Sequence, residues 1–120
     1  MSIHDFTALL QEAGVDRVYV LGSVPTSPAY PYAVVSPAPG APQVRTVDGS
    51  GDPAGRFVVQ HFGRTLESVT DLADRSFAAF DGKPLTTFPD PPVAWQEVAS
   101  AVYRDPDDSG VLAITHTYRY

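Results

Sequence analysis

The sequence predicts an α+β fold: a single domain over residues 1–120, with a single mixed β-sheet, two helices packed on one face and a projecting β-arm. Three observations support this prediction. Two segments repeat apolar residues at helical spacing, several shorter segments are rich in β-branched and aromatic residues, and a proline- and glycine-rich stretch covers 37–55. Because strands are expected on both sides of one long helix, a mixed sheet with helices on one face is the simplest architecture.

The first expected element is a short amphipathic helix over residues 2–14. Ser2 can cap its start, and Gly14 supplies the left-handed residue that ends it. Its apolar residues recur at helical spacing: Ile3, Phe6, Leu9, Leu10 and Ala13. Strands are predicted next at Arg17–Leu21 and Tyr32–Ser36, joined by a proline-punctuated connection.

Residues 37–55 predict an arm. They begin with the stiff stretch Pro37–Pro42 and end in the flexible polar tip Asp48–Gly55. Between these, Gln43–Val47 could pair as a strand. The following segment, Arg56–Gly63, is apolar enough on both faces to be a central strand. Together these segments predict a β-arm that projects from the body of the domain.

The long helix is expected at Thr65–Phe80, capped by its first residue and ended by Asp81–Gly82. Its predicted apolar stripe consists of Leu66, Val69, Leu72, Ala73, Phe77 and Phe80. The segment Val93–Tyr103 fits a helix or a strand, and we favour a strand because the segment is short and precedes another one. An acidic turn at Asp105–Gly110 leads to a closing strand at Val111–Tyr118.

The composition excludes several classes of protein. Eight Lys and Arg against 14 Asp and Glu give a net charge of −6, and phosphate contacts need clustered cations, so a polyanion-binding surface is not expected. There is no cysteine, hence no disulfide, thiolate nucleophile or cysteine-type zinc site. We expect no targeting segment in residues 1–13 and no membrane association, since prolines interrupt the long uncharged run from Val18 to Val44.

Catalytic motifs are also lacking. His61 and His116 lie on predicted strands and would meet if those strands are neighbours; with an aspartate they could form a metal or acid–base site. We favour locally hydrogen-bonded or exposed histidines instead. The segment from Asp105 to Gly110 matches the start of a calcium loop, but His116 occupies the position that needs a bidentate glutamate. We therefore expect no catalytic residue, no cofactor and no metal, and no enzyme.

The layout of the chain carries a further indication. The relevant segments are the opening helix, the strand Tyr32–Pro37 before the proline and glycine loop, Phe57–Gly63 before the long helix, Asp71–Arg75, Phe80–Gly82, Val102–Asp105 and Tyr118–Tyr120. In this layout the chain resembles the tail terminator, or tail completion, family of long-tailed bacteriophages, especially those that infect actinobacteria.

The resemblance implies a hexameric ring that caps the tail tube, ends its growth and joins the tail to the head. The implied partners are other copies of the chain, the major tail tube protein and a head-side neck protein, with DNA only passing through. The implied location is the tail–head junction of the virion, after assembly in the host cytoplasm. A ring also has a physical basis, because a domain of 12.9 kDa cannot enclose a channel alone, whereas heterologous contacts can close into rings.

Two groups of residues are candidates for function in such a ring. The candidate interface residues are Asp48, Gly49, Ser50, Gly51 and Asp52 at the tip of the arm, and Asp71 and Arg75 on the long helix. The candidate lumen or rim residues are Asp105, Asp107 and Asp108, whose charge would repel passing DNA.

Three alternatives remain open at this point. The first is a related head–tail connector or neck protein, and the second is an acidic binding or inhibitor module that acts as a monomer. The third is a small enzyme that uses His61 or His116.

Overall fold

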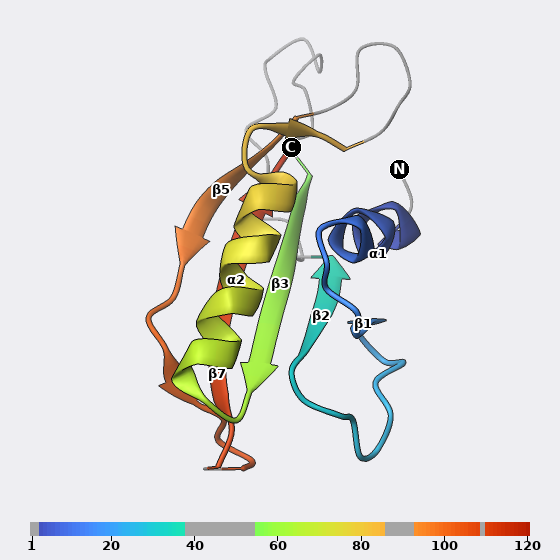
Figure 1. Ribbon diagram of the computed structural model, residues 1–120. Coiled ribbons are helices and arrows are strands. Elements are labelled where there is room, and N and C mark those ends of the chain that lie inside the picture. The colour runs from blue at the N-terminus through green and yellow to red at the C-terminus, as the bar shows by residue number, and fades with distance from the viewer. Residues whose placement is uncertain (1–2, 38–54, 86–92, 109) are drawn as a thin grey trace, which may run out of the picture.

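The computed structural model describes residues 3–37, 55–85, 93–108 and 110–120. These residues form two layers, with helices α1 (Ile3–Glu12) and α2 (Leu66–Phe80) on one face of a seven-stranded mixed sheet (Figure 1). The strands are β1 (Val18–Val20), β2 (Tyr32–Pro37), β3 (Arg56–Gly63), β4 (Lys83–Pro84), β5 (Val93–Ala99), β6 (Tyr103–Arg104) and β7 (Leu112–Arg119). The predicted α+β class, with a mixed sheet and helices on one face, is confirmed.

The strand order in the sheet is β1-β2-β3-β7-β5-β4, and β6 pairs with β7 as well. Strands β1 and β2 are parallel, and every other described pairing is antiparallel. The central position predicted for Arg56–Gly63 is confirmed, because β3 lies between β2 and β7. The strand interpretation of Val93–Tyr103 is confirmed for β5, which ends at Ala99; residues 100–102 are not in a strand, and Tyr103 begins the separate strand β6.

The core lies between the helices and the sheet, and Phe57 of β3 is at its centre. The Phe57 ring stacks on Phe6 of α1 at a centroid distance of 4.2 Å and on Tyr118 of β7 at 5.1 Å. Phe80 of α2 meets it edge-on at 4.9 Å. All four side chains are buried, so one aromatic cluster joins both helices to the two central strands.

The ends of the helices follow local sequence signals. Thr65 caps α2: its hydroxyl accepts a hydrogen bond from the Ser68 amide at 3.1 Å, and the Ser68 hydroxyl accepts one from the Thr65 amide at 3.3 Å. At the other end, the Asp81 carboxylate accepts a bond from the Gln96 amide of β5 at 2.9 Å. Helix α1 is followed by Gly14 in the left-handed conformation, with φ +93°, as predicted.

The predicted apolar stripe of α2 is wrong at two positions. Leu66 and Phe77 are exposed, and Ser76 takes a place in the buried stripe instead. The reason is that the helix is rotated so that Ser76 faces the buried imidazole of His61, to which its hydroxyl is hydrogen bonded. This rotation leaves Leu66 and Phe77 exposed at one edge of the buried stripe.

The ends of the predicted arm belong to the sheet. Pro37 is the last residue of β2, and Gly55 exchanges two backbone hydrogen bonds of 2.9 Å with Tyr120. Residues 38–54, which include the possible strand Gln43–Val47, lie outside the described residues. Directly after Asp81 and Gly82, Lys83 and Pro84 form β4, which pairs with β5.

The role of Phe57 can be tested by truncation. We expect Phe57→Ala to lower the free energy of unfolding by about 3–5 kcal/mol, because it removes the ring that both helices and β7 contact. The matched control is Phe62→Ala, on the same strand but half-buried on the opposite face of the sheet. Urea denaturation of both variants would contradict this account if their losses of stability were equal.

Candidate functional site

The face of the sheet opposite the helices, called the open face here, is the first candidate surface. Residues paired across neighbouring strands share a face, and Ser36, Val58, Thr117 and Val98 form one such row across β2, β3, β7 and β5. Phe57, His61 and Tyr118 point the other way, toward the helices. Both described helices lie on that other side, so the open face has neither of them over it (Figure 1).

One end of the open face is hollowed into a groove of about 440 Å³. Its floor is made by side chains of β2 and β3, and its walls by the segment after β1 and by β6 with the following turn. The lining residues are Leu21, Val24, Tyr32, Val34, Gln60, Phe62, Tyr103, Asp105, Pro106 and Asp107. Tyr32 stacks on Phe62 at 5.0 Å, and the Tyr103 hydroxyl is hydrogen bonded to Thr115 Oγ1 at 2.8 Å. The groove is thus aromatic, with an acidic rim.

The predicted rim residues Asp105, Asp107 and Asp108 all lie on the turn that borders this groove. Asp105 Oδ1 accepts a bond from the Asp107 amide and Asp108 Oδ1 accepts one from the Gly110 amide, both at 3.0 Å. These two side chains therefore help to hold the turn. Burial raises the pKa of Tyr32, and the nearby Tyr30 and Asp105 carboxylate raise it further.

The two strand histidines meet, as the sequence predicted for neighbouring strands. Their ring centroids are 4.8 Å apart, between α2 and the sheet. His61 Nδ1 donates to the Ile114 carbonyl at 2.9 Å, so its Nε2 accepts the bond from the Ser76 hydroxyl at 2.7 Å. His116 Nδ1 is 3.0 Å from the Tyr118 hydroxyl. Both rings are thus buried and locally hydrogen bonded, which is the interpretation that the sequence favoured.

Neither a metal cluster nor a membrane span is found in the described ranges. Within residues 3–37, 55–85, 93–108 and 110–120, no three His, Asp or Glu side chains gather closely enough to hold a metal ion. Among the same residues, no helix is both long enough and apolar enough to cross a membrane.

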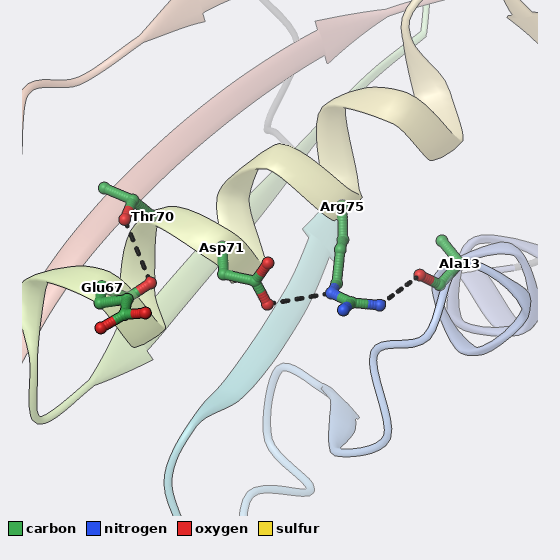
Figure 2. Close-up of polar contacts among 5 residues, drawn as sticks. All are labelled: Ala13, Glu67, Thr70, Asp71 and Arg75. Atoms are coloured by element: carbon green, nitrogen blue, oxygen red, sulfur yellow. Dashed lines mark hydrogen bonds and ion pairs between the residues drawn. The ribbon is translucent and has the colours of Figure 1, made fainter.

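Asp71 and Arg75, predicted as interface residues, form a contact within the chain (Figure 2). Arg75 Nε donates to Asp71 Oδ2 at 3.0 Å, and another guanidinium nitrogen donates to the Ala13 carbonyl at 3.4 Å. Ala13 follows the last turn of α1, which has no basic residue of its own. Arg75 thus places a cation where the dipole of α1 favours one, and links the two helices. The other predicted interface residues, Asp48 to Asp52, lie outside the described residues.

Sequence reasoning missed the groove and the exposed apolar side chains of the open face. Trp95 and Val98 of β5 and Tyr103 of β6 are exposed there. A register shift between Gln96 and Val98 brings Val98 opposite Thr117. The available signal was the alternation in β7, where Thr115 and Thr117 alternate with buried residues and mark a half-polar face. The sequence contains no comparable signal for which strands lie beside β7.

Comparison with known proteins identifies a similar fold. No protein-family model and no curated protein sequence matches the chain. A protein chain in the structure of the virion of a native gene transfer agent (GTA) particle superposes on it with a TM-score of 0.68 and 18% sequence identity. The match covers 98% of this chain and 89% of that one, so the two chains share their fold over nearly their whole length.

Protonation of His61 provides a test of the buried site. Its pKa is lowered to about 4 from an ordinary 6.5, mainly by burial; the bond to Ile114 opposes this shift and the neighbouring His116 adds to it. Because the unfolded chain takes up this proton at higher pH than the folded chain, stability falls as pH falls from 6.5 toward 4. The loss from this residue approaches about 3 kcal/mol.

The measurement is urea denaturation across this pH range for the wild type and His61→Gln. Glutamine can donate to the Ile114 carbonyl and accept from Ser76, but it does not titrate. We expect the variant to lose much less stability on acidification than the wild type. Equal pH dependence of the two chains would show that His61 is not buried in its neutral form.

Proposed function

We propose that this chain is a structural protein of a phage virion that forms a ring on the end of the tail tube, ends tube growth and joins the tail to the head. The observation that carries the proposal is the likeness to a chain of a GTA virion, a phage-like particle, over nearly the full length of both proteins. The resemblance of the sequence to tail terminators supports the same role. On this proposal the chain has no catalytic activity.

The surface of the domain is compatible with assembly. Exposed apolar side chains occur on both layers: Leu66 and Phe77 on α2, and Trp95, Val98 and Tyr103 on the strands. A ring needs two different surfaces on each subunit that fit one another, and apolar patches on opposite layers provide such a pair. The predicted arm, residues 37–55, is proposed to reach a neighbouring subunit or the tube.

We assign the acidic turn to the lumen or rim of the ring. Asp107 and Asp108 are exposed, and Asp105 is half-buried beside the groove. Six copies of a chain with net charge −6 carry a formal −36, and carboxylates facing the channel would let DNA pass without binding. DNA is therefore a passing polymer in this proposal and not a ligand.

A head–tail connector or another neck protein of the same fold would share the GTA likeness. The two roles differ in their partner, because a terminator binds the end of the tail tube and a connector binds on the head side. A monomeric binding module would bind neither and would not assemble.

The proposal is tested by growing tail tubes from the tube protein of the same particle, with and without this chain, and measuring tube lengths by electron microscopy. We expect the chain to limit tube length and to be visible as a ring at one end. Tubes of unchanged length without bound protein would contradict the terminator role; binding only to head-side neck proteins would favour the connector.

Neutralising the acidic turn tests the lumen assignment. We expect Asp105→Asn/Asp107→Asn/Asp108→Asn to change the free energy of unfolding by less than about 0.5 kcal/mol, because asparagine Oδ1 can still accept the bonds of the turn. We expect rings to form but fewer infectious particles. The control Glu12→Gln/Asp16→Asn removes exposed carboxylates elsewhere. Infectivity equal to that of the control would remove the lumen role.

A further inference from the structure

One side of α2 presents apolar side chains to solvent although the helix is amphipathic. Leu66 is 58% exposed and Phe77 is 43% exposed. They are eleven residues apart, or about three helical turns, so they lie on the same side of α2 with Thr70 between them. We call Leu66, Thr70 and Phe77 the outer strip of α2. Around the helix axis, Leu66 and Phe77 lie within about 40° of the buried Ala73, so the strip borders the buried stripe of α2 along one exposed edge of the helix.

The open face carries a second apolar area. Val98 is 57% exposed and Trp95 is 52% exposed, and both lie on β5 opposite residues of β7 that point away from the helices. Val58 and Thr117 continue the row from Val98 toward the centre of the sheet. Each chain therefore has one apolar surface on its helix layer and another on its sheet layer.

The two surfaces are similar in length and opposite in the sign of their nearby charge. Helix α2 has 15 residues, about 22 Å, and β3 and β7 have eight residues each, about 26 Å. Along α2, the exposed carboxylates Glu67, Asp71 and Asp74 outnumber the single cation Arg75. At the end of the open face near Trp95 and Val98, Arg56 and Arg119 accompany the carboxylate of Glu97, which Arg56 binds at 2.7 Å. Asp105 and Asp107 lie at the other end of this face, beside the groove.

We propose that the outer strip of α2 in one copy docks on the open face of a second copy, around Val58, Val98 and Thr117. The contact is heterologous, because each chain uses a different surface toward each of its two neighbours, and such contacts generate closed rings when the rotation between copies closes. The inference rests on the proposed ring and specifies the contact that would build it.

The test uses two variants that keep the net charge at −6. Leu66→Glu/Phe77→Lys places charges on the outer strip with the signs that the ends of α2 favour. Val98→Lys/Thr117→Glu places an opposite-charge pair across β5 and β7 on the open face. The control, Ala8→Glu/Gln11→Lys, makes a comparable change on the exposed side of α1. Circular dichroism and thermal unfolding verify that all three variants fold.

Absolute mass by light scattering is the readout, for each variant and for an equimolar mixture of the strip and face variants. We expect each of the two variants alone to be a monomer, while the control assembles like the wild type. In the mixture, the intact strip of one variant can dock on the intact face of the other, so we expect heterodimers of about 26 kDa, twice the mass of one chain, and no larger species.

A strip variant or face variant that assembles like the wild type would overturn the proposed contact, and so would a mixture that stays monomeric. In both cases, a wild type that assembles would still support a ring. The experiment therefore distinguishes failure of the proposed contact from failure of the proposed function. A wild type that is a monomer at every concentration would overturn both.

Discussion

The ring of Phe57 connects every layer of this domain. It is stacked between Phe6 of α1 and Tyr118 of β7, and Phe80 of α2 packs against its edge. Because all of these aromatic rings are on one side of the sheet, the core formed by the described residues is one-sided.

The buried imidazole of His61, between α2 and the sheet, constrains the rotation of α2. His61 is buried and uses both ring nitrogens, one for the Ile114 carbonyl and one for Ser76. A buried imidazole without these partners would be costly, so Ser76 must face the sheet. This sets the rotation of α2 and leaves Leu66 and Phe77 exposed at one edge of its buried stripe. The exposure of the apolar strip proposed for assembly is therefore a consequence of the hydrogen bond between Ser76 and the buried His61.

Local signals made much of the fold predictable. The caps at Thr65 and Gly14 and the β-branched runs in β2 and β3 depend on neighbouring residues in sequence, and the structure has these elements where they were expected. Hydrophobic spacing alone did not give the rotation of α2, because Ser76 is held inward by a partner fifteen residues away in sequence. The groove was also not predictable, since it depends on which strands are neighbours.

The candidate site was predicted only in part, because some of its features are local in sequence and others depend on the tertiary fold. The acidic turn is visible in the sequence, and the structure places it beside the groove. Asp71 and Arg75 were read as residues for a partner, whereas their described contacts are to each other and to α1, because the position of Ala13 relative to α2 is a property of the tertiary fold.

Absolute mass of the unmodified chain in solution, measured by light scattering from micromolar to millimolar concentration with and without magnesium, tests the central claim most directly. A closed ring of six chains predicts a species near 77 kDa, six times the 12.9 kDa of one chain. A mass of 12.9 kDa at every concentration would contradict the self-assembly on which the account depends.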